Sequence, residues 1–287
     1  MFPQRLAVND YLIQDPRYLQ AYADFFCKFV EAYAEEGINI RRVMYQNEAW
    51  SYTPYPGCAW TAQGIIRFNA EYLGPTMREK HPDVDIFLGT INTNRLEVIE
   101  EVVADERVRQ TIKGMGFQWE GRQIIKQLQE TYPDFAYVQT ENECGNGTFD
   151  WAAAEHTFDI MNIYLGLGCR DYTFWNAILA DDGSSQWGWR QNALIQIDSD
   201  SKSVNFTPEY FAVKHYANII KAGSKLLGSK ASDEDGLPVI VYLSPQGEYE
   251  VVAGNLSDTA QDLCVKLGGL YLNATLPAHS FHSFREK

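Results

Sequence analysis

Two glutamates stand where apolar stretches of the sequence give way to polar residues. Glu48 lies in QNEAW, residues 46–50, and Glu141 lies in QTENE, residues 139–143. A carboxylate at the end of a buried strand is costly to desolvate, so it either faces solvent or is held there for acid/base or nucleophilic chemistry. A single glutamate more often faces solvent. Two of them at the ends of strands in one sheet, with tryptophans at two further strand ends, favour a carbohydrate site.

Cleavage of a glycosidic bond requires this pair of groups. One carboxylic acid protonates the leaving oxygen, and one carboxylate acts on the other side of the sugar, with no metal or cofactor. Where the two carboxyl groups lie about 5–5.5 Å apart, the second can attack the sugar directly and the configuration is retained. The sequence does not supply that distance.

The two glutamates need a scaffold that brings strand ends together, and the hydrophobic pattern predicts one. Short apolar segments alternate with segments of helical spacing, which is typical of β-α-β units and a parallel sheet. The predicted strands are 38–45, 84–89, 112–119, 135–140 and 171–176. The predicted helices are 15–37, 60–73, 96–104, 122–132, 151–166 and 208–223.

The pattern changes towards the end of the chain. Residues 178–206 are polar and read as loop, and beyond Gly228 short alternating segments indicate antiparallel β-structure of sandwich type. We therefore expect an α/β portion at residues 1–228 and a β-sandwich portion at residues 229–287.

Composition limits the classes of partner. The chain has 287 residues and a net charge of −14, which repels phosphate backbones and anionic headgroups, so nucleic acid and membrane surfaces are unlikely partners. No apolar run reaches the roughly 20 residues that span a bilayer. The start of the sequence lacks a secretory signal, so we expect the chain as given to be cytoplasmic or truncated at its N-terminus. No cysteine or histidine pattern indicates a metal site, and oligomeric state is left open.

The order and spacing of several motifs resemble glycoside hydrolase family 30, the glucosylceramidase-like family, over nearly the whole chain. The motifs are QNEAW, DVDIFLGTINTN, IKGMGFQWEG, VQTENECGNG, YTFWNAILADDGSSQWGW and TPEYFAVKHYANIIKAGSKLL. The resemblance implies a retaining β-glycosidase built as a (β/α)8 TIM-type barrel with an attached β-sandwich. Its substrate would be a β-linked glycoside or oligosaccharide.

The resemblance also implies roles for individual residues. Glu48 matches the acid/base that ends the fourth strand, and Glu141 matches the nucleophile that ends the seventh. Glu143 is an alternative nucleophile, and we favour Glu141 because it lies nearer the strand end. The matching positions that would bind substrate are Asn47, Gln118, Trp119, Trp175, Asn176 and Trp187.

Two departures from the family pattern bear on function. Gln118 and Glu120 stand where the family often has His and Tyr, which affects sugar preference more than the reaction. Counted by strands, the chain begins just before the fourth barrel strand, so we expect an incomplete barrel with strands 4–8. The alternative function is therefore a catalytically silent, truncated carbohydrate-binding or interaction fragment of such an enzyme.

Overall fold

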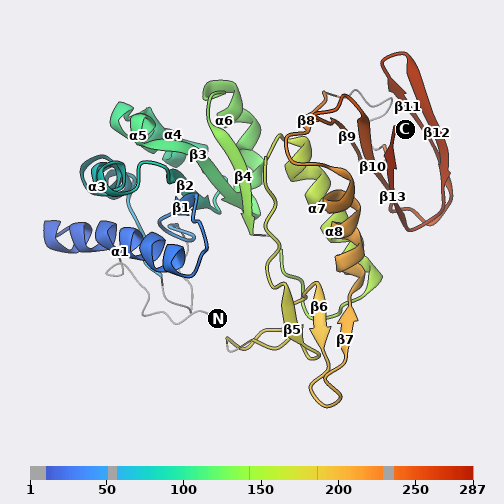
Figure 1. Cartoon of the computed structure of the whole chain (residues 1–287), viewed down its shortest axis with the longest axis horizontal. Helices are drawn as coiled ribbons and strands as arrows, with labels where there is room; N and C mark the ends of the chain where they lie inside the picture. The colour runs from blue at the N-terminus through green and yellow to red at the C-terminus, as the bar shows by residue number, and fades with distance from the viewer. Residues whose placement is uncertain (1–10, 51–56, 142, 186, 229–235, 287) are drawn as a thin grey trace. The chain divides into compact units, whose positions relative to one another are not determined.

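The chain folds into two compact units, which are described separately. The computed structural model describes residues 11–50, 57–141, 143–185, 187–228 and 236–286 (Figure 1). Unit 1 is Met1–Glu141 and unit 2 is Asn142–Lys287. The boundary that the sequence predicts at 228/229 adjoins residues 229–235, which lie outside the described residues, and it stays a prediction.

Unit 1 alternates strands with helices, as predicted. Its strands are β1 (Arg42–Met44), β2 (Asp85–Ile91), β3 (Ile112–Gln118) and β4 (Ala136–Glu141). Its helices are α1 (Pro16–Glu35), α2 (Ala62–Arg67), the π-helix η1 (Phe68–Leu73), α3 (Gly74–Lys80), α4 (Leu96–Ala104), α5 (Glu106–Thr111), the 3-10 helix η2 (Trp119–Ile124) and α6 (Ile125–Thr131). The strands form one parallel sheet in the order β1-β2-β3-β4, which is the arc of an incomplete barrel.

Local chemistry explains where α1 begins and which face it buries. The Asp15 side chain accepts a hydrogen bond from the backbone N–H of Arg17 at 2.9 Å, and Pro16 occupies the first turn. Leu19 and Phe26, almost fully buried, then recur at helical spacing on the face that packs into unit 1.

Glycine in β3 allows two neighbouring groups to approach the strand closely. A Cβ on Gly114 would lie 2.2 Å from the carbonyl oxygen of Ala136 on β4 and 2.4 Å from the ring of Phe87 on β2. Any side chain at this position would therefore push apart the middle strands of the sheet.

Unit 2 combines two helices with mostly antiparallel strands. The helices are α7 (Trp151–Gly166) and α8 (Pro208–Ile219). The strands are β5 (Ile178–Ala180), β6 (Ile195–Ile197), β7 (Val204–Phe206), β8 (Lys225–Leu226), β9 (Val239–Leu243), β10 (Tyr249–Asn255), β11 (Gln261–Leu267), β12 (Leu270–Leu276) and β13 (Ser280–Arg285). A four-stranded sheet runs β13-β10-β9-β8, and β11 pairs with β12 in a separate ribbon.

Strand β10 is buried on both faces and joins two layers of unit 2. Val252 contributes to a cluster with Phe158 of α7, whose ring stacks on Phe281 of β13 at 4.5 Å. The next residue, Ala253, packs with residues of the β11-β12 ribbon in a second cluster. Alternation along one strand thus supplies a core to both layers, which confirms the predicted sandwich-type portion.

Two sequence predictions in unit 2 were wrong. No strand occupies 171–176 in the described chain. Its Tyr172 packs instead against the helices, with its ring edge-on to that of Tyr164 of α7 at 6.2 Å. Residues 178–206, predicted as loop, contain the three-stranded sheet β5-β6-β7. Its strands have three residues each, too few to show a period.

Replacing Gly114 by Ala is expected to destabilise the protein by about 1–3 kcal/mol, because the new methyl group meets backbone that cannot move aside. The matched control is Gly166→Ala at the end of α7, where a Cβ meets nothing within 4 Å. Thermal and urea unfolding of both variants measures the difference. Equal stability of Gly114→Ala and the parent chain would contradict the close approach described here.

Candidate active site

The loop after β1 buries Glu48 in a strained backbone conformation. Glu48 has φ 50°, in the left-handed region, and is 8% exposed. Its backbone N–H donates to the Thr90 hydroxyl at 3.2 Å, and the Gln46 carbonyl accepts from the Thr90 backbone N–H at 2.6 Å. A non-glycine residue with positive φ costs about 1–3 kcal/mol and is often found at functional sites.

One buried amide connects the two glutamates. The Gln118 nitrogen Nε2 lies 3.1 Å from Glu48 Oε1 and 3.3 Å from Glu141 Oε2, and the side chain is fully buried. The two carboxylate oxygens therefore cannot be farther apart than the sum of 3.1 Å and 3.3 Å. A separation within this limit includes the roughly 5–5.5 Å of retaining glycosidases.

Curvature of the sheet is needed for this contact. Neighbouring strands lie about 4.8 Å apart, so in a flat sheet the ends of β1 and β4 would be about 14 Å from each other. Gln118 ends β3 and is the ladder partner of Glu141, which explains one of its two contacts. The other contact, with Glu48, requires the ends of β1 and β4 to converge on the concave side of a barrel arc.

The environment of Glu141 favours its protonated form. The pKa of Glu141 is raised to about 7, chiefly by burial and also by the nearby charge of Glu48. Two hydrogen bonds oppose this by stabilising the carboxylate: Trp119 Nε1–H donates to Oε1 at 3.2 Å, and the Gln118 amide donates to Oε2. Trp119, like Glu48, has a positive φ, of 49°.

Asn47 has its amide oxygen turned towards the protein. Asn47 Oδ1 accepts from the Thr90 hydroxyl at 2.7 Å and from Gln118 Nε2 at 3.3 Å. Since an amide presents its oxygen and its NH2 group in different directions, the Asn47 NH2 group is directed away from these donors. Asn47 is exposed, so this donor is accessible from outside the sheet.

The remaining predicted residues lie in unit 2 and are described there. Trp175 and Trp187 are about two-fifths exposed, at 42% and 38%. Asn176 has φ 66° and donates to Gln191 Oε1 at 3.0 Å. The structure thus gathers five predicted residues, Asn47, Glu48, Gln118, Trp119 and Glu141, into one cluster in unit 1.

The alternative nucleophile, Glu143, has a different partner. Its carboxylate lies 2.9 Å from His156 Nε2, within unit 2. Glu141, in contrast, shares the Gln118 amide with Glu48. Glu141 therefore lies close to a second carboxylate, whereas Glu143 pairs with a histidine.

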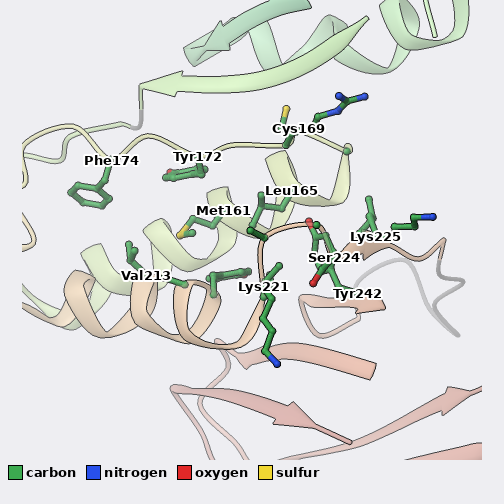
Figure 2. Close-up of a pocket in the computed structure, with 18 residues that line it drawn as sticks. Met161, Leu165, Cys169, Tyr172, Phe174, Val213, Lys221, Ser224, Lys225 and Tyr242 are labelled. Atoms are coloured by element: carbon green, nitrogen blue, oxygen red, sulfur yellow. The ribbon is translucent and has the colours of Figure 1, made fainter. Parts of the chain in front are cut away.

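A cavity of about 680 Å³ lies in unit 2 among α7, residues 168–174 and α8 (Figure 2). Met161 and Leu165 of α7 and Val213 of α8 give it an apolar wall. None of the predicted site residues, and no carboxylate, is among the described residues that line it. The lining of this cavity thus includes neither glutamate.

Sequence reasoning missed two hydroxyl groups that support the cluster. Thr90 follows the apolar core of β2 and bonds Asn47 and the Glu48 backbone. Thr140 donates to Gln118 Oε1 at 3.0 Å. Thr140 directly precedes Glu141, and this adjacency was the one available signal.

The described ranges contain no candidate metal centre and no membrane-spanning helix. No group of three or more His, Cys, Asp or Glu side chains there could hold a metal ion. No helix among the described residues is long and apolar enough to cross a membrane.

Comparison with protein families identifies both parts of the chain. The family model of the glycosyl hydrolase family 30 TIM-barrel domain matches residues 12–220. The model of the glycosyl hydrolase family 30 beta sandwich domain matches residues 223–284. Together the two matches account for nearly all of the sequence.

Individual proteins also resemble the chain, at low sequence identity. The lysosomal acid glucosylceramidase of Mus musculus is 23% identical over 289 residues, which cover 92% of this chain and 55% of that protein. The chain therefore spans about half the length of this curated relative.

Solved structures share the fold. The crystal structure of SrfJ from Salmonella typhimurium superposes with a TM-score of 0.87 at 20% identity, over 95% of this chain and 63% of that one. The endo-beta1,6-glucanase BT3312 superposes with a TM-score of 0.79 at 22% identity, over 94% and 63%.

The raised pKa of Glu141 predicts a pH-dependent effect of Glu141→Gln on stability. A pKa of about 7 in the folded state, against an ordinary value of 4.5, means that the protonated carboxyl stabilises the fold at low pH and that this contribution is lost as pH rises through about 7. At pH 8 the uncharged Gln should therefore raise the melting temperature by about 2 °C or more. At pH 4 the two proteins should melt alike.

Differential scanning calorimetry of both proteins from pH 4 to pH 8 measures this difference. A lower melting temperature of Glu141→Gln at pH 8 would contradict the account of a carboxylate desolvated by burial.

Proposed function

The chain belongs to glycosyl hydrolase family 30, and from that membership and the paired carboxylates we propose that it is a retaining β-glycosidase. The observation that carries the proposal is the single Gln118 amide that bonds both Glu48 and Glu141. The limit that this sets on the separation of the two oxygens agrees with direct attack by one carboxylate. The substrate that we propose is a β-linked glucoside, because the mouse relative is named a glucosylceramidase.

Hydrolysis would proceed in two displacements. The ionised Glu141 attacks the anomeric carbon while Glu48 gives its proton to the leaving oxygen, so that the glycosidic bond breaks and an ester to Glu141 forms. Glu48, now a carboxylate, removes a proton from water, and the resulting hydroxide displaces Glu141 from the sugar. The second step returns both glutamates to their starting states.

Neighbouring groups have defined roles in this scheme. The Trp119 indole N–H and the Gln118 amide stabilise the ionised form of Glu141 that the first step requires. The Asn47 NH2 group is the donor that we assign to the sugar 2-hydroxyl, because its oxygen is already bonded to Thr90 and Gln118. Trp175, Asn176 and Trp187 remain proposed substrate-binding residues.

The rival proposal, binding of carbohydrate without turnover, predicts the same contacts but no bond cleavage. The chain covers about half of its curated relative, so activity of the chain by itself is a question for experiment. Hydrolysis of aryl β-glucosides at a rate well above that of a Glu48→Gln/Glu141→Gln double variant would exclude the silent alternative.

A mechanism-based inactivator should identify the nucleophile. A 2-deoxy-2-fluoro-β-glucoside with a good leaving group should form a stable ester on Glu141, since the fluorine slows both formation and hydrolysis and the good leaving group restores the rate of formation alone. Peptide mapping by mass spectrometry locates the label, and Glu143→Gln is the matched control, which should label as the parent chain does. A label on Glu143 would overturn the assignment.

The dependence of the rate on the leaving group distinguishes the acid from the nucleophile. Glu48→Gln should lower kcat/KM for alkyl or p-methoxyphenyl glucosides by about 10²–10⁴-fold, because these leaving groups need a proton. With a 2,4-dinitrophenyl leaving group the loss in kcat/KM, which reports the first displacement, should be much smaller. Glu141→Gln should abolish turnover of both substrates. Similar losses for both leaving groups in Glu48→Gln would contradict its role as the acid.

The pKa of Glu141 predicts the acidic limb of the pH profile. Because attack requires the ionised carboxylate and its pKa is raised to about 7, the rate should fall as pH decreases below about 7. Measurement of kcat/KM from pH 5 to pH 8 tests this. A rate that stays constant from pH 7 down to pH 5 would show that Glu141 is already ionised throughout that range.

A further inference from the structure

We infer that the Thr140 hydroxyl is a positioning group, which fixes the Gln118 side chain so that its NH2 group, and not its oxygen, faces the paired glutamates. This inference deepens the proposed function and rests on it for the catalytic role of the pair. The orientation itself rests on the geometry of unit 1 alone.

The Gln118 amide has fewer protons than it has neighbouring acceptor oxygens. A glutamine side chain has one oxygen that accepts and one nitrogen that donates two protons. Three acceptor oxygens surround the nitrogen of Gln118, from Asn47, Glu48 and Glu141, at 3.3, 3.1 and 3.3 Å. With two protons for three oxygens, the amide bonds at most two of them strongly at one time.

The oxygen of the Gln118 amide has a donor of its own. Gln118 Oε1 accepts the Thr140 hydroxyl proton at 3.0 Å. A rotation of the amide by half a turn would place its NH2 group at the Thr140 hydroxyl and its oxygen against two carboxylates, where acceptors would face acceptors. The carboxylates disfavour the turned amide, and in the observed orientation the Thr140 hydroxyl donates to Oε1 and so restrains the side chain there.

Because Gln118 is buried, the orientation of its amide affects the pKa of Glu141. Gln118 is fully buried, so water cannot replace a hydrogen bond that the amide loses. The Gln118 amide is one of the two donors that lower the pKa of Glu141 against its burial. A Gln118 side chain that is free to turn would therefore stabilise the Glu141 carboxylate less well, and Glu141 would hold its proton to higher pH.

The groups that face Glu141 from the elements around it are few. Glu48 comes from the loop after β1, and Gln118 and Trp119 come from β3 and η2. In the part of the chain that the structure describes, Glu48 is the charged group that shifts the pKa of Glu141. The Thr140 hydroxyl has no charge, so its removal changes the pKa of Glu141 through the Gln118 amide.

The Thr140 hydroxyl also has a competing acceptor. The Phe117 carbonyl oxygen lies 3.2 Å from the Thr140 hydroxyl, slightly farther than Gln118 Oε1. Since a hydroxyl has one proton, it serves one acceptor at a time. If the Phe117 carbonyl held the proton throughout, Thr140 would have no influence on Glu141, which makes the inference testable.

The Trp119 indole provides a readout that does not depend on turnover. Its N–H donates to Glu141, so the indole N–H signal in a ¹⁵N NMR spectrum should follow protonation of this carboxyl. The chain has seven tryptophans, and loss of a signal in Trp119→Phe assigns the one in question. The other six indole signals show whether each variant is folded.

The experiment compares the midpoint of that titration in the parent chain and in two Thr140 variants. In the parent chain we expect a midpoint near pH 7. Thr140→Val, which keeps the branched shape suited to a strand, should raise the midpoint by about 0.5–1 pH unit. Thr140→Ser, which restores the hydroxyl, should return it to the parent value. If the valine variant does not fold, Thr140→Ala removes the same hydroxyl.

A double-mutant cycle tests whether Thr140 acts through Gln118. Gln118→Leu removes the amide, so adding Thr140→Val to it should cause no further shift. Three results would each overturn the inference. The midpoint could stay unchanged in Thr140→Val, or Thr140→Val could shift the midpoint of Gln118→Leu as much as it shifts that of the parent chain. The third is an indole signal of the parent chain that does not change with pH.

Turnover measured on the same samples separates this inference from the proposed function. A chain that shows the predicted shift but hydrolyses no glycoside would contradict the proposed function and support the positioning role. A chain that hydrolyses glycosides but whose midpoint is unchanged in Thr140→Val would support the proposed function and contradict the positioning role.

Discussion

The contact between one buried amide nitrogen and two carboxylates is the constraint on which the site depends. Gln118 reaches Glu48 on one side and Glu141 on the other, and its own side chain is fully buried. Burial raises the pKa of Glu141, and the nearby Glu48 carboxylate adds to that effect, so the contact sets the protonation of the proposed nucleophile.

The rest of unit 1 follows from this requirement. A parallel sheet places the polar ends of β1 to β4 at one edge, and curvature brings the outer two of these ends together. Positive φ angles at Glu48 and Trp119 direct the chain so that both side chains face the same point. Such backbone strain is tolerated where the surrounding structure holds it, as the Thr90 hydroxyl does by accepting the Glu48 backbone N–H.

The sequence predicted the parts of this arrangement that periodicity and motif order determine. Four parallel strands, the helices between them and the antiparallel final portion were correct, and Glu48, Gln118 and Glu141 do meet. It did not predict the roles of Thr90 and Thr140, because a hydroxyl that bonds a buried neighbour looks in sequence like any strand threonine. The predicted strand at 171–176 was wrong because Tyr172 packs against helix α7, and an aromatic residue that packs on a helix looks in sequence like one in a strand.

Titration of the two carboxyl groups tests the central claim most directly. With ¹³C-labelled glutamate, the δ-carbon signals of Glu48 and Glu141 can be followed from pH 4 to pH 9 and assigned by Glu48→Gln and Glu141→Gln. A coupled pair predicts that Glu48→Gln lowers the midpoint of Glu141 from about 7, because the neighbouring charge that raises it is gone. An unchanged Glu141 midpoint in that variant would show that the two glutamates titrate independently, and would contradict the account.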